Sequence, residues 1–419
     1  MMKIIKKDEY FKTATILKGD ESVTSAVSQI LDRVKTDGDN AVREYTLRFD
    51  NVRLDALEVS KDEINQAYES IDEYFLETLK QAKANIENYH REQRRHGYEL
   101  NCGDGIKLGQ IVRPLKRVGV YVPGGTAAYP STVLMDVIPA KIAGVEEVVL
   151  VSPCRDGKVN PAVLAAAKLA GADRVFRIGG AQAIGALAYG TESVPKVDKI
   201  VGPGNAFVAE AKKQVFGLVD IDMIAGPSEI LVVADDSARA DYVASDLLGQ
   251  AEHDKRAGIT LVCLSDEFAK SVQKEVEDRL SVLPRADIAR HSINNGVIVV
   301  VDNLLDAIDI ANDVAPEHLE LCVDKPFELL DKVKNAGGIF LGHFSPEALG
   351  DYFAGTNHTL PTSGTARFAS PLSVDDFVKK SSYLYYTQDA LVKVGERVAD
   401  FATREGLDAH AESIKVRLK

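Results

Sequence analysis

The chain has 419 residues, and at about 100–200 residues per domain this length predicts two or three domains. Hydrophobic residues make up 45% and charged residues 27%, which is enough for an ordinary globular core. The net charge of −13 argues against nucleic acid or an anionic membrane as the main partner, because both require basic surface patches.

The N-terminal segment has no apolar signal region, and no apolar run reaches the ~18 residues of a membrane span. We therefore expect a soluble, cytoplasmic protein. The four cysteines are widely separated and form no Cys-x-x-Cys pair, which is typical of reduced thiols and not of a disulfide scaffold or a thiolate zinc site. They are Cys102, Cys154, Cys263 and Cys322.

Residues 21 to about 96 have the apolar spacing of helices, near 3.6 residues per turn. Ser60 and Glu63 form a capping-box pattern at the start of one of these helices. His90 and His96 lie in a highly charged stretch, so we interpret them as part of a solvated helix face.

From Ile111 onward, short β-type runs alternate with helical runs, and this alternation predicts parallel βαβ units with helices on both faces of each sheet. The first series has expected strands at 118–122, 148–151, 174–178 and 199–201. The second series has them at 230–235, 259–264, 297–301 and 338–342. The tail from about 380 is expected to be helical, with an interruption at Gly406. The predicted fold class is therefore α/β, with two Rossmann-like domains, a helical N-terminal region and a helical C-terminal tail.

Three glycine-rich turns follow strands of the first series: Pro123-Gly124-Gly125, Gly179-Gly180 and Gly202-Pro203-Gly204-Asn205. Glycine allows close approach of a phosphate, and the helix that follows offers free N–H groups. None of the turns is the G-x-G-x-x-G fingerprint, so a dinucleotide site and ordinary tight turns both stay open. Asn205 could equally be a helix N-cap.

Histidines and carboxylates gather at four places in the C-terminal part of the chain. Gln250 and His253 are three residues apart on a predicted helix and share one face, which suits a metal site only weakly. Glu317 and His318 follow a proline break and could be a general base and acid, or simply a polar helix end.

The other two places are a loop and the tail. The segment 350–358 has the composition of a functional loop, and it contains Asp351 and His358. Either residue alone would be uninformative. Glu405 and His410 lie five residues apart near the C-terminus.

Several segments together closely resemble the histidinol dehydrogenase family. They occur in the family's order across residues 115 to 410, and the longest is Ile221-Asp-Met-Ile-Ala-Gly-Pro-Ser-Glu-Ile-Leu-Val-Val-Ala-Asp. The others are Tyr121-Val-Pro-Gly-Gly, Gly180-Ala-Gln-Ala-Ile, Gly202-Pro-Gly-Asn-Ala-Phe, Gln250-Ala-Glu-His, Ala315-Pro-Glu-His-Leu-Glu, Gly355-Thr-Asn-His-Thr-Leu-Pro-Thr and Glu405-Gly-Leu-Asp-Ala-His.

The resemblance implies an enzyme that oxidises L-histidinol to L-histidine through L-histidinal, with two hydride transfers to NAD and one zinc ion per subunit. It implies Glu317 and His318 as the catalytic pair. The implied zinc ligands are Gln250, His253, Asp351 and, from the other subunit of a homodimer, His410. The implied substrate contacts are Ser228, Gln250, His253, Glu317, Asp351, His358, Glu405 and His410. The implied NAD contacts are Tyr121, Gln182 and Asn205.

The resemblance also implies a discontinuous main α/β domain, residues 1–120 with 230–375, which includes the N-terminal helices. An inserted α/β domain spans 121–229, and the helical tail 376–419 reaches the partner's active site.

Three alternative functions remain. The nearest is a paralogous NAD-dependent amino-alcohol or diol dehydrogenase. A non-catalytic nucleotide-binding regulator would leave the zinc set and the Glu317–His318 pair unexplained. A transferase acting on a phosphorylated sugar is disfavoured because no basic cluster lies near the glycine turns.

Overall fold

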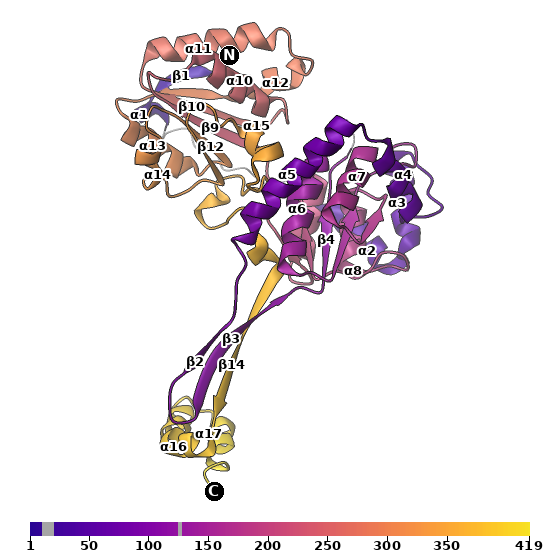
Figure 1. Ribbon diagram of the computed structural model, residues 1–419, viewed down its shortest axis with the longest axis vertical. Helices are drawn as coiled ribbons and strands as arrows, with labels where there is room; N and C mark the ends of the chain where they lie inside the picture. The colour runs from indigo at the N-terminus through magenta and orange to yellow at the C-terminus, as the bar shows by residue number, and fades with distance from the viewer. Residues whose placement is uncertain (11–20, 125–127) are drawn as a thin grey trace. The chain divides into compact units, whose positions relative to one another are not determined.

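The computed structural model describes residues 1–10, 21–124 and 128–419, so Gly125 of the first glycine turn lies outside the described residues. The chain divides into two compact units (Figure 1). The larger unit comprises Met1–Gln93 with Leu115–Phe377, and the smaller comprises Arg94–Pro114 with Val378–Lys419. Within the described ranges, no helix combines the length and the apolar character needed to cross a bilayer.

The larger unit contains a six-stranded parallel sheet with the order β1-β11-β10-β9-β12-β13. Its strands are β1 (Lys3–Lys6), β9 (Glu229–Ala234), β10 (Gly258–Cys263), β11 (Val297–Val300), β12 (His318–Cys322) and β13 (Gly338–Leu341). The chain runs outward from β9 to β11 and then returns to place β12 on the other side of β9. The order in which the chain adds strands therefore reverses between β9 and β12, and this point is the topological switch point of the sheet.

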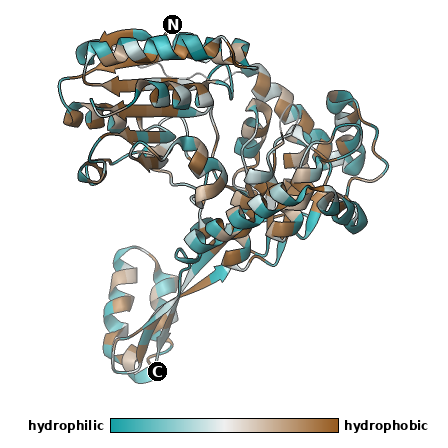
Figure 2. Cartoon of the chain, turned by 45° about the horizontal axis from the view of Figure 1, so that its top comes forward, coloured by the Kyte–Doolittle hydropathy of each residue, from teal (hydrophilic) through white to brown (hydrophobic). Residues whose placement is uncertain are grey.

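Helices cover both faces of this sheet because successive strand residues point to opposite sides. Ile230 and Val232 pack with one helix layer, whereas Leu231 and Val233 pack with the other. Figure 2 shows the hydrophobic residues gathered in these strands and the hydrophilic residues on the helices around them. The first layer contains α10 (Ala240–Ala251), α11 (Asp266–Leu280) and α12 (Ala286–Asn295), and the second contains α13 (Leu304–Val314). Two short helices, α1 (Lys7–Tyr10) and α14 (Phe327–Leu330), complete this region.

A second parallel sheet in the larger unit has the order β6-β5-β4-β7-β8. Its strands are β4 (Arg117–Tyr121), β5 (Glu147–Val151), β6 (Arg174–Phe176), β7 (Lys199–Val201) and β8 (Asp220–Ile221). The connecting helices are α6 (Pro130–Ala143), α7 (Pro161–Ala170), α8 (Gly180–Tyr189) and α9 (Ala206–Val215). The predicted α/β class with two parallel sheets is confirmed, and here the switch point lies between β4 and β7.

The N-terminal helices pack against the five-stranded region, whereas the family resemblance implied that they join the six-stranded sheet. They are α2 (Glu21–Asp37), α3 (Asp39–Asp50), α4 (Lys61–Ser70) and α5 (Glu73–Arg91). Val27, Leu31 and Ile86 belong to the same buried core as Val118 and Leu187. Amphipathic periodicity identified the apolar face of each helix, but it carries no information about which sheet covers that face. The domain limits themselves remain a prediction.

Two local expectations for this helical region have different outcomes. The capping box of α4 is confirmed, because Ser60 and Glu63 exchange side-chain to backbone hydrogen bonds. The solvated position expected for His90 is wrong, because its side chain is fully buried and its Nδ1 lies 2.9 Å from the carbonyl of Ile86.

The smaller unit is an antiparallel sheet followed by two helices. Its strands, in the order β14-β3-β2, are β2 (Tyr98–Asn101), β3 (Ile106–Pro114) and β14 (Val378–Tyr386), and its helices are α16 (Gln388–Arg404) and α17 (Asp408–Lys415). The tail was expected to be helical from about 380, but its first part is β14, paired with β3 from Val378 to Tyr386. Long-range pairing of this kind is not visible in a local pattern.

Candidate active site

The predicted catalytic pair lies at the amino edge of the six-stranded sheet, at its switch point. His318 is the first residue of β12, and its register partner on the neighbouring strand β9 is Ile230. Glu317 immediately precedes β12, and its Oε2 accepts a hydrogen bond from the backbone N–H of Glu229 at 2.9 Å. Sites in open α/β sheets usually occupy the carboxyl ends of the strands, so this placement departs from the common rule.

The end of α10 brings Gln250 against His318. Gln250 Nε2 lies 3.0 Å from His318 Nδ1, which is also 3.1 Å from the carbonyl oxygen of Glu229. The Oε1 atom of Gln250 is buried and has no hydrogen-bond partner in the protein. An orphaned buried oxygen of this kind is costly unless a ligand or an ion completes it.

Three carboxylates surround the buried ring of His318. Glu317 Oε2 lies 3.7 Å from Nδ1, while Asp351 Oδ1 and Glu347 Oε1 lie 3.6 Å and 3.9 Å from Nε2. Burial alone would lower the pKa of His318, but the neighbouring negative charges outweigh it and raise the pKa to about 10. Burial raises the pKa of Glu317 to about 7, against the opposing effect of His318.

Asp351 and His358 come from one irregular segment. Asp351 lies on a π-helical turn, Gly350–Ala354, which directly continues the short helix α15 (Glu347–Leu349). Such π-turns are rare and often occur at functional sites. His358 Nδ1 lies 3.0 Å from the carbonyl oxygen of Asp351, and its Nε2 lies 3.2 Å from the hydroxyl of Thr132 on α6. This segment therefore links the site to the five-stranded region.

Ser228 and His253 lie on the loops next to this group. Ser228 precedes β9, and its carbonyl oxygen accepts a hydrogen bond from Gly258 N–H at 2.9 Å. His253 follows α10 and is exposed, although the surrounding atoms still desolvate its ring enough to lower its pKa, an effect that Asp351 opposes. Its exposed position leaves the ring accessible to a ligand.

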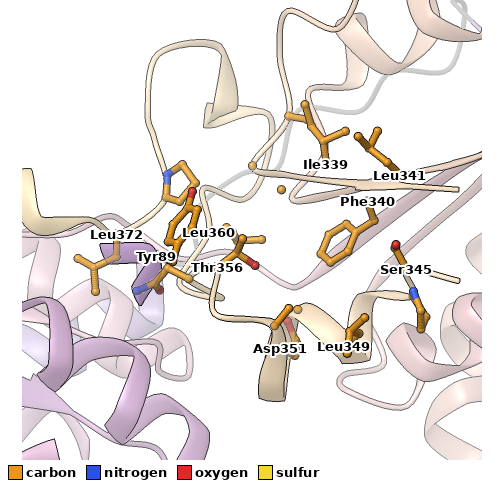
Figure 3. Close-up of a pocket in the computed structure, with 18 of the residues that line it drawn as sticks. Tyr89, Ile339, Phe340, Leu341, Ser345, Leu349, Asp351, Thr356, Leu360 and Leu372 are labelled. Carbon is orange, nitrogen blue, oxygen red and sulfur yellow. The ribbon is translucent and has the colours of Figure 1, made fainter. Parts of the chain in front are cut away.

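A pocket of about 470 Å³ opens beside Asp351. Figure 3 shows Asp351 and Leu349 on one side of it and Phe340 of β13 on another. The remaining wall is largely apolar and includes Tyr89, Leu360 and Leu372. An apolar pocket with one carboxylate at its edge is a typical small-molecule site.

Glu405 and His410 belong to the smaller unit. Glu405 is the C-cap of α16 and His410 lies on α17. Both line a hollow of about 600 Å³ in that unit, together with apolar side chains that include Val398 and Phe401. They are thus in a different unit from the other predicted site residues, and the shared site remains a prediction.

The predicted NAD contacts lie around the switch point of the five-stranded sheet. Tyr121 ends β4, and its hydroxyl accepts a hydrogen bond from Gly180 N–H at 3.1 Å. Gln182 is buried on α8 with its Oε1 unpartnered. Asn205 is the N-cap of α9, where its side chain accepts hydrogen bonds from Phe207 and Val208 N–H, so the N-cap alternative is confirmed.

Sequence reasoning missed three buried or half-buried carboxylates near His318. They are Glu347, Glu320 and Asp246. Among the described residues, His318, Glu347 and Asp351 place ligand-type atoms within 4.8 Å of one another. The available signals were that Glu320 lies two residues after His318 on a strand and Asp246 lies four residues before Gln250 on a helix, and both spacings place side chains on a shared face.

The comparisons with known proteins agree on one family. The family model described as Histidinol dehydrogenase matches residues 16–418. A histidinol dehydrogenase of Bacillus cereus is 56% identical over 402 residues, covering 96% of this chain and 94% of the relative. One of Clostridium acetobutylicum is 54% identical over 416 residues, covering 98% and 96%. The crystal structure of histidinol dehydrogenase from Elizabethkingia anophelis is similar with a TM-score of 0.94 and 36% identity, covering 100% of this chain and 98% of that one.

Proposed function

The chain belongs to the histidinol dehydrogenase family, and from this premise we propose that it carries L-histidinol through L-histidinal to L-histidine in two NAD-dependent oxidations. It is an oxidoreductase that oxidises histidinol in histidine biosynthesis. The observation that carries the fuller proposal is the buried Glu317–His318 pair at 3.7 Å, because a four-electron oxidation needs both a base for the alcohol and a base for water.

The two residues have separate tasks in this proposal. His318 accepts the proton of the alcohol as the first hydride leaves the carbinol carbon. Glu317, with a pKa near 7 from burial, then removes a proton from the water that attacks the aldehyde. The resulting hydrate loses the second hydride and becomes the carboxylate. NAD, when bound, accepts each hydride.

Zinc fits the residues that surround His318. Gln250 offers a buried oxygen without a partner, Asp351 offers a carboxylate whose pKa is held below its usual range despite burial, and His253 offers an accessible imidazole. We assign these three as ligands from the larger unit and His410 of the partner as the fourth. Zinc, when bound, orients the imidazole and amine of the substrate, and its positive charge disfavours the protonated form of His318.

NAD fits the carboxyl edge of the five-stranded sheet. A Cβ at Gly202 would lie 2.1 Å from the carbonyl oxygen of Tyr121, so only glycine allows the two strand ends to approach this closely. The unpartnered Oε1 of Gln182 adds a polar atom that a nucleotide can satisfy. These features support Tyr121 and Gln182 as cofactor contacts, while the Asn205 side chain already caps α9.

The proposed enzyme is a homodimer in which each subunit contributes residues to the active site of its partner. Glu405 and His410 bind substrate and zinc in the partner's site, and Ser228 and His358 contact the substrate within the same chain. The exposed side chains Val398 and Phe401 on α16 support the idea that this unit is covered in the assembly.

The test is the number of NADH molecules formed for each L-histidinol consumed, measured with and without a zinc chelator. We expect two NADH per substrate, loss of turnover with chelator, and recovery when zinc is restored. One NADH per substrate, or no turnover of histidinol, would favour the paralogous amino-alcohol or diol dehydrogenase instead.

A further inference from the structure

Glu320 and Asp246 are acidic residues that belong to neither the predicted catalytic pair nor the predicted zinc ligands, and they lie next to the contact between His318 and Gln250. Glu320 follows His318 by two residues on β12, so both side chains point to the same face of the sheet. Asp246 precedes Gln250 by four residues on α10, so these two share one face of the helix. The strand and the helix are thus joined by two successive contacts, His318 to Gln250 at 3.0 Å and, behind it, Glu320 to Asp246.

The second contact joins two carboxyl groups. Ligand-type atoms of Asp246, Glu320 and Cys322 lie within 4.8 Å of one another, and Glu320 is fully buried. Two adjacent carboxylates, of which Glu320 is buried and Asp246 half-buried, cannot both ionise at low cost, so one proton held between them resolves the repulsion. In agreement, burial raises the pKa of Asp246 to about 6 and raises that of Glu320 well above its ordinary value, and Asp246 adds to the shift in Glu320.

Glu320 also holds the start of the segment that carries Asp351. Its Oε1 accepts a hydrogen bond from the backbone N–H of Glu347 at 2.8 Å. Glu347 begins α15, and Asp351 follows it by four residues on the π-helical turn. The Oε1 atom of Glu347 lies 3.9 Å from His318 Nε2. A shift of Glu320 would therefore move two of the carboxylates that surround His318.

We propose that Asp246 and Glu320 are positioning residues for this site: they share one proton, and the pair fixes the backbone of Glu347, and through it Asp351, against His318. This inference rests on the proposed function, because it assigns Asp351 to zinc. Residues that orient metal ligands typically cost about 10–100-fold in metal affinity or activity when they are removed.

A second metal ion between Asp246, Glu320 and Cys322 is the competing explanation of the same cluster. Among the described residues, the buried side-chain oxygens that lack a hydrogen-bond partner include none from Asp246 or Glu320, and the Cys322 thiol lies 4.0 Å from Glu320 Oε2. Burial also raises the pKa of the Cys322 thiol, which keeps it protonated and makes it a poor ligand. These contacts favour a proton shared between the two carboxyl groups over a bound ion.

The test compares Glu320→Gln with Glu320→Leu in the full-length protein. Glutamine keeps an oxygen for Glu347 N–H and donates to Asp246, so we expect zinc affinity and kcat within about threefold of the wild type. Leucine keeps the volume but loses both contacts, so we expect a loss of about 10–100-fold in zinc affinity, measured by competition with a chromogenic chelator. Glu328→Leu, at an exposed position of α14, is the matched control and should leave zinc affinity and kcat unchanged.

Three results would overturn the proposal. One is a Leu variant with wild-type zinc affinity, and another is a Gln variant as impaired as the Leu variant, because the charge would then matter more than the hydrogen bonds. The third is a zinc content that falls from two ions to one in Cys322→Ala.

If Glu320→Leu does not fold, Glu320→Ser, which is too short to reach Glu347, replaces it with the same expected loss. Zinc titration needs no turnover, so a protein that fails to oxidise histidinol would refute the proposed function without deciding this inference.

Discussion

His318 Nε2 lies 3.6 Å from Asp351 Oδ1, a contact that joins the first residue of β12 to a π-helical turn. The same carboxylate is a proposed zinc ligand, so its negative charge would be shared between the zinc ion and His318, the proposed proton-transfer residue. Asp351 contributes to the raised pKa of His318, and the positive charge of a zinc ion on that carboxylate would oppose this contribution.

The first prediction concerns Asp351. Asp351→Asn keeps the shape of the side chain but removes the negative charge beside His318. We expect zinc affinity to fall by at least about tenfold, because the replacement ligand is neutral. Competition with a chelator measures this affinity, and Asp351→Asn with unchanged zinc affinity would remove Asp351 from the ligand set.

The second prediction concerns the cofactor turn. Gly202 has a φ of +110°, and an added Cβ would meet the carbonyl of Tyr121 at 2.1 Å. Gly202→Ala should weaken NAD binding by more than tenfold. The added Cβ introduces local backbone strain on the order of 1–3 kcal/mol, and the turn must shift to relieve it. Gly217→Ala is the matched control, because Gly217 has a φ of +96° but no atom within 4 Å of its added Cβ. Titration of NAD by fluorescence gives both dissociation constants, and equal weakening in both variants would contradict the proposed site.

The third prediction concerns stability and pH. Burial raises the pKa of Asp136 from its ordinary 3.8 to about 8, Asp222 adds to the rise, and the hydrogen bond from Thr359 opposes it. Because the folded state holds this proton more tightly, the free energy of unfolding should fall as pH rises from about 4 to about 8. Each pH unit changes it by at most about 1.4 kcal/mol.

Asp136→Asn should therefore become more stable relative to the wild type as pH increases, since asparagine still accepts from Thr359 and cannot ionise. Urea unfolding at pH 5, 6.5 and 8 measures the difference. The exposed variant Asp302→Asn should show a constant difference. A constant difference for Asp136→Asn as well would mean that this carboxyl titrates normally.

The fourth prediction tests whether active sites are shared between subunits. His410→Ala and Glu317→Ala should each be inactive as pure proteins, because each removes one proposed contribution. Mixed after unfolding and refolding together, they should regain part of the activity, since some dimers then contain one intact site. Sites built within a single chain would leave the mixture as inactive as its components.

The fold followed from the sequence wherever the signal was local. Alternating apolar strands and helices predicted both parallel sheets, and Ser60 with Glu63 predicted the start of α4. β12 was missed because its first and third residues, His318 and Glu320, are polar, although all five residues of the strand are buried. β14 was missed because its pairing with β3 joins distant parts of the chain. The grouping of the N-terminal helices with the six-stranded sheet came from the family resemblance, and the apolar face of a helix does not by itself identify the sheet that covers it.

For the site, too, local sequence signals were predictive and long-range packing was not. Glu317 and His318 were singled out as adjacent residues of the types that catalysis needs, and the resemblance added their roles. Glu347 and Asp246 were not singled out, because a carboxylate in a helical pattern usually indicates a solvated face. Their significance comes from tertiary packing, which places both near buried β12 side chains: Glu347 beside His318 and Asp246 beside Glu320. Only the three-dimensional structure carries that information.

The central claim is that Glu317 and His318 divide the two oxidations between them, and Glu317→Gln tests it most directly. The rate of NADH formation is measured separately with L-histidinol and with L-histidinal as the starting substrate. We predict that Glu317→Gln lowers kcat for the aldehyde much more than the single-turnover rate for the alcohol, because only the aldehyde step needs activated water. Equal losses in both half-reactions would contradict the division of labour.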